Sequence, residues 1–529
     1  MPFSSKSGKD TIKWIVDRVS HETALDIGAG VGDYARLFPN IKMTGIEVWK
    51  PYIEQYGLGS LYDQILNVDA RTYEFEEKYD IGFLGDVLEH MEVEEAQALF
   101  EKTRKCCKTV IISIPIGHYP QPEWEGNPYE RHITDNWSVE EVIGAFGKPE
   151  YWVQDAEIGV FAYSEQPIRP KICVYAISKN EEQFVDRFCH SARDADLILI
   201  ADTGSTDSTV DWARERGAVV PSICISPWRF DHARNAALAL IPRDMDVCIS
   251  LDLDEILEPN WREEIERVWI MGKTTRLRYY FDWGCGIKFK YEKIHARHGY
   301  HWHHPCHEYP VADGRIQEVW ADTDMLLAVH KPDPTKSRGQ YLDLLRISVE
   351  EDPHCPRNAF YYARELSFHQ MWVKAIEECN RYLNLPRADW PNERCYAYRV
   401  MGRCYSELGN VTEAEKAFQK AAFEAPNTRE PWCELALLYY RQHRWPECYA
   451  AADRALKIVN RQFVYTVDPA VWGAQPHDLA SISAWHMGLK DVALEQARIA
   501  VEKEPEDPRL VGNLRFIEDF NQSLNQEAA

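Results

Sequence analysis

Residues 247–255 constrain the fold more than any other stretch, because they form an apolar run that ends in paired acids. Five residues, Val-Cys-Ile-Ser-Leu, lead directly into Asp252 and Asp254. Such a run is typical of a buried parallel strand. In open α/β sheets, ligands bind beyond the carboxyl ends of the strands, so both carboxylates are predicted at a ligand site. Carboxylates there can hold Mg²⁺ or Mn²⁺, which shares its coordination with substrate phosphates.

The chain contains four Asp-x-Asp triplets, and their positions relative to apolar runs distinguish them. Those at 194/196, 244/246 and 322/324 precede apolar runs, so we predict them at the entrances of strands. Only the triplet at 252/254 follows such a run. A solvated acidic turn is the alternative interpretation of that triplet.

Length and composition indicate several globular domains. The chain has 529 residues, 45% of them hydrophobic, which corresponds to about three or four domains. No apolar run approaches the roughly 18–20 residues of a membrane span, and residues 1–10 do not resemble a signal peptide. The fourteen cysteines include no C-x-x-C pair, so we expect reduced thiols in a cytoplasmic protein. A net charge of −24 opposes binding to nucleic acid or anionic membranes.

Residues 1–165 repeat one pattern, a short apolar run followed by a glycine turn or an acid. The residues that follow these runs are Gly28, Gly30, Gly32, Glu47, Asp69 and Asp86. Glycines let a backbone approach a ligand closely, and the helix start beyond them suits a polar cofactor group. An acid at the end of the second strand can accept hydrogen bonds from ribose hydroxyls. The pattern predicts a cofactor site on an α/β fold.

This segment resembles a class I S-adenosylmethionine-dependent methyltransferase. The resemblance rests on Asp26-x-Gly28-x-Gly30-x-Gly32 and on Glu47, Asp69 and Asp86, in the family's order and spacing. It implies a Rossmann-like fold in which the glycines line the methionine part of S-adenosylmethionine and Asp26 belongs to the cofactor-binding residues. It also implies that Glu47 holds the ribose, Asp69 faces the adenine and Asp86 lies beside the methyl group. A nucleotide-binding fold that has lost activity is the alternative.

The resemblance does not identify the group that would accept the methyl. Residues 115–137, after the fifth predicted strand, form a loop with many polar and aromatic side chains that could cover an acceptor. These are His118, Tyr119, Trp124, Tyr129, Arg131 and His132. His132 is a candidate general base; an ordinary surface loop with a structural histidine is the alternative.

Residues 168–335 begin a second sheet after the proline-punctuated stretch 166–170. Four blocks follow in order: Lys-Asn-Glu-Glu at 179–182, Asp-Thr-Gly-Ser-Thr-Asp at 202–207, Phe-x-x-Ala-Arg-Asn at 230–235 and Leu-Asp-Leu-Asp-Glu at 251–255. Together they resemble family 2 glycosyltransferases of the GT-A fold. The resemblance implies transfer of a sugar from a nucleotide donor, usually with inversion and with a divalent metal ion.

The glycosyltransferase resemblance suggests roles at a donor site. Asp252 and Asp254 would bind Mn²⁺ or Mg²⁺, which neutralises the diphosphate leaving group of a nucleotide sugar such as a UDP-linked one. Arg234 could donate a charged hydrogen bond to phosphate, with a structural ion pair as the alternative. Asp202 would hold the nucleoside, and Asn235 completes the predicted donor site.

An inverting transfer also needs a base at the acceptor hydroxyl. Glu308 follows a histidine, as in the family, and is predicted as this base, with Asp282 as the alternative. His330 matches a family histidine after a later strand and is a candidate third metal ligand; a satisfied histidine near the core is the alternative. The histidine-dense stretch 298–308 could also be read as a zinc site, but its spacing fits no recognised pattern well.

Residues 338–529 change from strands to helices with an internal repeat. Gly409 and His443 occupy equivalent places in two helical pairs, 34 residues apart, and further copies begin near residues 370 and 488. The helical pair after Glu407 is predicted to break before Ala421. A 34-residue period with small packing residues resembles tetratricopeptide repeats, an all-α solenoid. Such stacks bind peptides or proteins or mediate self-association; mere support of the transferase is the alternative.

The three segments together predict a bifunctional enzyme with a helical repeat tail. One head would transfer a sugar, and the other would methylate that sugar or a nearby group of the same product. A glycosyltransferase with an inactive or regulatory first domain is the second hypothesis. A scaffold that recruits partners through its repeats, without turnover, is the third.

Overall fold

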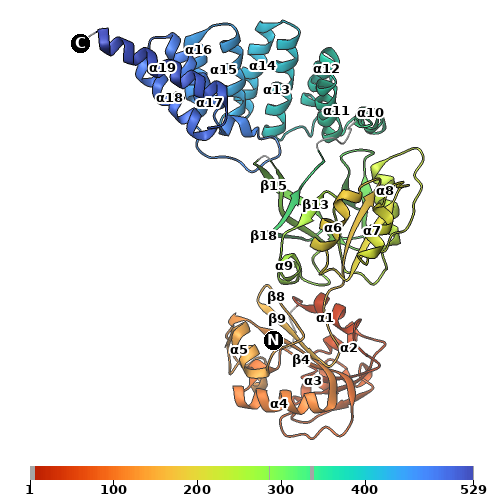
Figure 1. Cartoon of the computed structure of the whole chain (residues 1–529). Coiled ribbons are helices and arrows are strands. Elements are labelled where there is room, and N and C mark those ends of the chain that lie inside the picture. Colours follow the sequence, from red (N-terminus) through yellow and green to blue (C-terminus); the bar gives the residue numbers. More distant parts are fainter. Residues whose placement is uncertain (1–5, 285, 334–338, 528–529) are drawn as a thin grey trace.

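The computed structural model describes residues 6–284, 286–333 and 339–527, with side chains described up to residue 519. Figure 1 shows two parts that contain sheets, followed by a long array of helices. The three parts follow one another in chain order, and the predicted boundary near 335–338 lies outside the described residues. Among the described residues, no helix is both long and apolar enough to cross a membrane.

The first α/β part contains a seven-stranded sheet in the order β3-β2-β1-β4-β5-β9-β8. The first five strands in this order are parallel, and β9 and β8 are antiparallel to their neighbours. The strands are β1 (Thr23–Ile27), β2 (Lys42–Ile46), β3 (Gln64–Leu66), β4 (Tyr79–Gly85), β5 (Cys107–Pro115), β8 (Tyr151–Asp155) and β9 (Ile158–Ser164).

Helices cover both faces of this sheet because its strands are apolar on both sides. Helices α1 (Lys9–Val16) and α2 (Asp33–Leu37) share one buried cluster with strand residues such as Ile111. Helices α4 (Val93–Cys106) and α5 (Val139–Phe146) share the opposite cluster with its neighbour Ile112. The remaining short elements are α3 (Lys50–Gln55), η1 (Leu58–Ser60), η2 (Leu88–His90), β6 (Gly117–His118), η3 (Pro128–Glu130) and β7 (Asn136–Trp137).

The second α/β part has a seven-stranded mixed sheet in the order β11-β10-β12-β15-β14-β18-β13. Its strands are β10 (Ile172–Ser178), β11 (Leu197–Asp202), β12 (Val247–Ser250), β13 (Glu255–Leu257), β14 (Arg276–Gly284), β15 (Ile287–Ala296) and β18 (Trp320–His330). Its helices are α6 (Glu182–Ser191), α7 (Thr209–Glu215), α8 (Phe230–Leu240) and α9 (Trp261–Val268), and β16 (Tyr300–His303) pairs with β17 (Tyr309–Ala312).

The structure corrects one of the Asp-x-Asp assignments. Asp322 and Asp324 lie inside strand β18, not at its entrance. The Lys290 ammonium group contacts both carboxylates, at 2.7 and 2.5 Å. Its positive charge offsets theirs, which makes two acids acceptable inside a strand. The other two triplets predicted at strand entrances do precede β11 and β12.

Helix α1 of the first α/β part forms hydrogen bonds with residues of the second α/β part. The Trp14 indole N–H donates to Asp246 at 2.9 Å, and the Thr11 hydroxyl donates to the Met271 carbonyl at 2.8 Å. Arg18 also forms an ion pair with Asp246. One continuous cluster of buried apolar residues includes members of both parts. The two sheets therefore share a core even though the chain between them is short and punctuated by prolines.

The C-terminal part is a succession of helices that pack pairwise. The helices are α10 (Tyr341–Glu351), α11 (Pro356–Phe368), α12 (Trp372–Leu383), α13 (Pro391–Glu407), α14 (Val411–Glu424), α15 (Glu430–Arg441), α16 (Trp445–Leu456), η4 (Pro469–Trp472), α17 (Gln475–His486), α18 (Lys490–Lys503) and α19 (Pro508–Glu527). Small residues such as Gly402 sit at the contacts, where an added Cβ would lie 2.4 Å from the Phe418 ring. The predicted break before Ala421 is wrong: α14 continues through an alanine-rich stretch that has no glycine or proline to end it.

The helical part also contacts the second α/β part. Arg229 forms an ion pair with Glu351 of α10, and the His307 ring stacks on Tyr361 of α11 at a centroid distance of 3.9 Å. The segment between α16 and α17 reaches back as well, since the Tyr465 ring lies 6.1 Å from that of Phe289 on β15. These helices therefore build part of the wall around the second sheet.

In four of the turns that connect consecutive helices, one residue has left-handed backbone angles. The residues are Gln370 (φ 59°), Gly409 (φ 74°), His443 (φ 57°) and Gly488 (φ 75°). This conformation costs a residue other than glycine about 1–2 kcal/mol. The repeat is thus visible in the backbone as well as in the sequence.

Replacing the exposed Gln370 by glycine is expected to stabilise the helical part by about 0.5–1 kcal/mol. Relief of left-handed strain exceeds the extra entropy that glycine loses on folding. The thermal midpoint of this part should rise by about 2–4 °C. A Gln370→Ala variant keeps the strain and should show no rise, and equal midpoints for both variants would contradict the explanation.

Candidate functional sites

A cavity of about 310 Å³ lies at the carboxyl ends of the parallel strands in the first sheet. Of the residues predicted to bind a cofactor, the structure brings five to its wall: Gly28, Gly30, Glu47, Asp69 and Asp86. They come from turns after three neighbouring strands and from the segment after β3. Pockets of this size bind drug-sized molecules and cofactors. The spacing pattern in the sequence therefore corresponds to a real concavity.

The glycine turn is held against the end of β2. Gly28 donates its backbone N–H to the Ile46 carbonyl at 2.9 Å, and Gly30 donates to the Glu47 carboxylate at 2.9 Å. Trp49 donates a backbone N–H to the other carboxylate oxygen of Glu47 at 2.7 Å. Glu47 is only 5% exposed although it lines the cavity. These bonds fix the orientation of the Glu47 carboxylate at the cavity wall.

Asp26 and Gly32 do not belong to the residues that line the cavity. Asp26 is buried at the end of β1, where it accepts a hydrogen bond from the Tyr62 hydroxyl at 2.5 Å. Burial raises the pKa of Asp26 to about 7. Gly32 precedes α2 with φ 82°, so it serves the turn into the helix.

The two remaining acids differ in their surroundings. Asp69 is half-buried and forms an ion pair with Arg71 at 2.7 Å, and this hydrogen-bonded pairing lowers the pKa of the Asp69 carboxyl. Asp86 follows β4 with φ 53°, a left-handed conformation, and its backbone N–H donates to the Ser113 carbonyl at 2.7 Å. Left-handed residues other than glycine often mark functional turns.

Glu47 is expected to make the first α/β part less stable as pH rises. Burial raises the pKa of Glu47 from 4.5 to about 7, although backbone hydrogen bonds oppose the rise. The folded state therefore holds this proton more tightly than the unfolded chain, and its advantage is lost between about pH 4.5 and pH 7. At 1.36 kcal/mol per pKa unit the loss is about 3 kcal/mol. Thermal midpoints of the wild-type chain and a Glu47→Gln variant should diverge over this range; parallel curves would contradict the assignment.

The loop at 115–137 does border the cavity. Its members in the wall are Pro115, Tyr119, Gln121, Asn127, Tyr129, Glu130 and His132. His118, Trp124 and Arg131 are absent from this wall. His132 has neighbours that the sequence analysis missed, since Glu89 and His90 of η2 line the same cavity. The sequence feature that could have identified them is their position shortly after Asp86, which follows a predicted strand.

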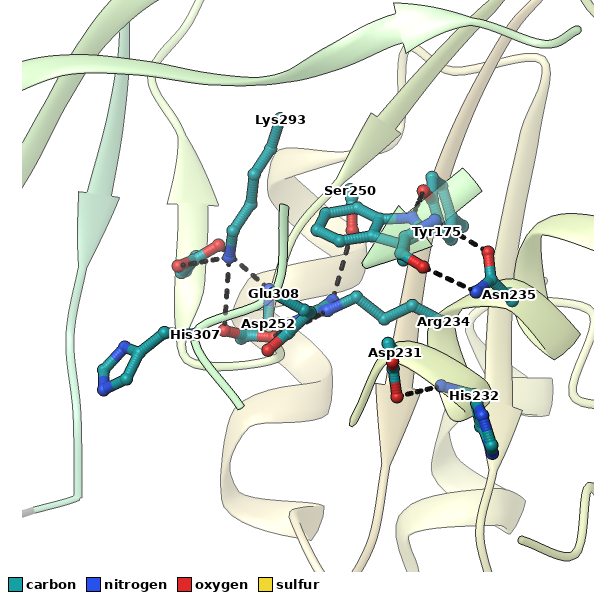
Figure 2. Close-up of polar contacts among 12 residues, drawn as sticks. Tyr175, Asp231, His232, Arg234, Asn235, Ser250, Asp252, Lys293, His307 and Glu308 are labelled. Atoms are coloured by element: carbon teal, nitrogen blue, oxygen red, sulfur yellow. Dashed lines mark hydrogen bonds and ion pairs between the residues drawn. The ribbon is translucent and has the colours of Figure 1, made fainter. Parts of the chain in front are cut away.

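In the second α/β part, the predicted donor-site residues gather beyond the end of β12. Figure 2 shows Asp252 between the side chains of Arg234 and Lys293, with Glu308 beside the same arginine. Arg234 is 3% exposed and donates to Asp252 at 2.6 Å and to the Ser250 hydroxyl at 3.2 Å. It also pairs with Glu308. Arg234 therefore forms a structural ion pair, which was the predicted alternative to phosphate binding.

Lys293 and Glu255 belong to this site and were missed as functional residues. Lys293, on β15, is 5% exposed and lies 3.5 Å from Asp252 and 3.4 Å from Glu255. Burial raises the pKa of Glu255 to about 7, and the Lys293 charge opposes the rise. A buried lysine inside a strand is rare without a carboxylate partner. That rarity was a usable signal, but its partner could not be identified before the sheet was known.

Asp254 and His330 meet at the other side of the turn. Strand β13 pairs with β18, and this places the His330 Nε2 atom 3.4 Å from the Asp254 carboxylate. Both side chains are largely buried, and the buried His330 Nδ1 atom has no hydrogen-bond partner among the described residues. Burial lowers the pKa of His330, but the Asp254 hydrogen bond and nearby carboxylates outweigh it and raise it overall. An oxygen and a nitrogen donor at this spacing fit a divalent cation.

The two candidate bases lie at different places. Glu308 is almost buried and engaged by Arg234, so its carboxylate is oriented towards Asp252. Asp282 lies near the end of β14, opposite Val329 of β18, and accepts a backbone hydrogen bond from Gly284 at 2.8 Å. Because Val329 directly precedes His330, Asp282 lies on the His330 side of the site and not beside Arg234.

Asp202 and Asn235 already have their polar groups engaged. The Asp202 carboxylate accepts hydrogen bonds from the backbone of Gly204 at 3.0 Å and from the Ser205 hydroxyl at 2.5 Å. The Asn235 amide donates to the Trp302 carbonyl at 2.8 Å and accepts from its N–H at 2.7 Å. Asp202 shapes a turn at the sheet edge, and Asn235 holds β16 against α8.

The histidine-dense stretch 298–308 does not form a compact metal site among the described residues. His304, for example, contacts Asn358 and Cys355 of the helical part. Figure 2 shows the His307 ring directed away from Asp252 and Lys293. Within the described ranges, the one group of three metal-ligating side chains with all ligand atoms within 4.8 Å is Glu89, His90 and His132. The thirteen described cysteines are free thiols.

No protein-family model matches the chain, and neither does any curated protein. Solved structures with local likeness include MamA, which is 17% identical over 32% of this chain and 89% of its own, with a TM-score of 0.26. YrrB, "a TPR protein with an unusual peptide-binding site", is 15% identical over 34% of this chain and 85% of its own, with a TM-score of 0.28. A protein described as an O-methyltransferase from Nostoc punctiforme is 17% identical over 29% and 54%, with a TM-score of 0.23. At these scores the likenesses do not establish a shared function.

Proposed function

We propose that the chain is a bifunctional enzyme that transfers a sugar from a nucleotide donor and methylates the glycan or a nearby group. The observation that carries the proposal is that residues chosen from sequence motifs alone line a cavity in one α/β part and gather around one strand end in the other. In each part the residues lie at the carboxyl edge of parallel strands, where α/β sheets bind ligands.

For the methyltransferase head, the support is the cavity and its polar contacts. The sheet order β3-β2-β1-β4-β5-β9-β8 is consistent with the Rossmann-like fold that the resemblance implies. S-adenosylmethionine fits the residues present, because Glu47 offers oriented carboxylate oxygens and the glycine turn leaves its backbone uncovered. When bound, it would supply an electrophilic methyl group. Asp69, Asp86 and the loop at 115–137 would position the cofactor and the acceptor.

For the glycosyltransferase head, the support is the pair Asp254 and His330 beside the cluster around Asp252. Asp254 and His330 would hold Mn²⁺ or Mg²⁺, which would neutralise charge on the diphosphate of the donor. Asp252 has cations on both of its oxygens, so Arg234 and Lys293 fix its orientation towards the donor. Glu308 would accept the proton of the acceptor hydroxyl, with Asp282 as the alternative.

The shared chain would keep each head near the other's product. Tethering raises the effective concentration of one enzyme near the product of the other, and the contacts of α1 with Asp246 and Met271 join the two heads. The helical repeats would bind a protein partner or a second copy of the chain, as tetratricopeptide stacks do. We place the protein in the cytoplasm on the basis of its free thiols.

The second hypothesis retains only glycosyl transfer, with an inactive or regulatory first part. The third is a scaffold in which neither head turns over. Binding of S-adenosylmethionine and of a sugar nucleotide with Mn²⁺, measured by calorimetry, distinguishes them. Binding of both supports the bifunctional enzyme, binding of the sugar nucleotide alone supports the second hypothesis, and binding of neither supports the scaffold.

The first test of the sugar transfer is donor hydrolysis by the purified chain against a panel of sugar nucleotides, with and without Mn²⁺. We expect metal-dependent hydrolysis of one donor and its loss in an Asp254→Ala variant. An Asp322→Ala variant is the matched control, because this acid lies outside the proposed site. If the folded wild-type chain hydrolyses no donor of the panel, the glycosyltransferase proposal is rejected.

A further inference from the structure

A carboxylate and two imidazoles converge in the wall of the first cavity. Glu89 and His90 lie in η2, directly after β4, and His132 lies in the loop that follows β5. One ligand atom from each of the three side chains lies within 4.8 Å of the others. The backbone holds the loop in this position, because the N–H groups of Ile133 and Thr134 both donate to the Glu89 carbonyl, at 2.8 and 3.0 Å.

Glu89 is a buried acid without a compensating neighbour. It is 1% exposed, and neither of its carboxylate oxygens has a hydrogen-bond partner among the described residues. An uncompensated buried carboxyl group is destabilising, so its presence at a cavity wall points to a bound cation.

The two histidines have the arrangement of metal ligands. The Nδ1 atom of His90 lies 3.1 Å from the Arg131 carbonyl, and that of His132 lies 2.6 Å from the Tyr119 carbonyl. A carbonyl only accepts, so Nδ1 carries the proton in both rings and Nε2 keeps its lone pair. Ligating histidines are oriented in this way by backbone carbonyls.

We propose that Glu89, His90 and His132 bind a divalent transition-metal ion at the side of the cavity formed by the loop at 115–137. Two nitrogen donors and one carboxylate favour Mn²⁺, Fe²⁺, Co²⁺ or Zn²⁺ over the all-oxygen preference of Ca²⁺ and Mg²⁺. Three protein ligands leave coordination positions open towards the cavity, where an oxygen atom of a hydroxyl or carboxylate ligand could bind. The site is separate from the proposed metal at Asp254, and its existence does not require methyl transfer.

The test is a titration with Co²⁺, whose visible absorption reports nitrogen and oxygen ligation. The full chain carries an Asp254→Ala substitution, so that the proposed donor-site metal does not contribute. We expect one Co²⁺ per chain, and affinity lower by about tenfold or more in Glu89→Gln and in His132→Asn variants, in line with the loss of a ligand. A His118→Asn variant, altered at an exposed histidine of the same loop, should bind Co²⁺ as the parent does.

Stability measurements separate loss of the site from loss of the fold. Glu89→Gln replaces a buried acidic group by a neutral amide of similar shape, so its metal-free thermal midpoint should equal or exceed that of the parent. Zn²⁺ should raise the midpoint of the parent and of His118→Asn but not of Glu89→Gln or His132→Asn. Absence of Co²⁺ binding by the parent, or an unchanged Co²⁺ affinity in both ligand variants, would overturn the proposal. Binding of S-adenosylmethionine is measured separately, so failure of the metal site and failure of the methyltransferase proposal remain distinguishable.

Discussion

Replacement of Arg234 by methionine is expected to destabilise the second α/β part by about 3–5 kcal/mol. The guanidinium group is buried and is the shared partner of Asp252 and Glu308. Methionine fills a similar volume but leaves Glu308, which is 9% exposed at its side chain, without its cation. Removal of one partner of a buried ion pair typically costs this amount, because the remaining charge stays buried.

Hydrogen exchange measures the opening free energy of each part of the chain separately, so it can locate this loss of stability in the second α/β part. Amides of β12 should exchange with a lower opening free energy in Arg234→Met, while amides of the helical part should be unchanged. Arg315→Met is the matched control, because Arg315 is 82% exposed at its side chain and exposed ion pairs contribute about 0–1 kcal/mol. Adding Glu308→Gln to Arg234→Met should restore part of the loss. A cost below about 1 kcal/mol for Arg234→Met would mean that the cluster is not the buried network described here.

Replacement of Gly28 by alanine is expected to abolish binding of S-adenosylmethionine and to destabilise the first α/β part. Gly28 has φ 76°, where a Cβ atom costs about 1–2 kcal/mol. The added Cβ would also lie 2.5 Å from the Cγ2 atom of Val87, in the segment that leads from Asp86 to Glu89. Relief of this clash must shift either the glycine turn or the segment after β4, and both border the cavity.

Calorimetric titration with S-adenosylmethionine measures this effect directly. Gly57→Ala is the matched control: Gly57 also has positive φ, 65°, but an added Cβ meets only the Ser60 hydroxyl oxygen, at 3.7 Å. It should lower stability through strain alone and leave affinity unchanged. If Gly28→Ala bound the cofactor as tightly as Gly57→Ala, the turn would not be the cofactor site.

Much of the local structure followed from pattern because strands and their exits have a strong local signal. The runs that end at Glu47 and at Asp252 are apolar, and a buried parallel strand has few other sequence forms. Boundaries were less predictable. Strand β15 continues to Ala296, which pairs with Val247 of β12, and no local feature of the sequence encodes that pairing.

The roles of individual polar residues were the least predictable part of the sites. Arg234 was predicted either to bind phosphate or to form a structural ion pair, and the structure engages it with two carboxylates from distant segments. Asn235 was expected at the donor, yet its amide is occupied by the Trp302 backbone. Motifs identify which residues lie at a strand end, but hydrogen-bond partners depend on which other strands arrive there.

By itself, the sequence determined the change from a sheet-containing region to a helical region, the strand ends that carry glycines and acids, and the helical repeat. These features depend on residues close together in the chain, where apolar periodicity and backbone preferences act directly. Only the tertiary structure decided that Lys293 is buried beside Asp252 and that His132 joins Glu89 and His90. Each of these contacts requires a specific pairing of distant strands and loops, and its energy depends on burial that no local stretch of sequence can specify.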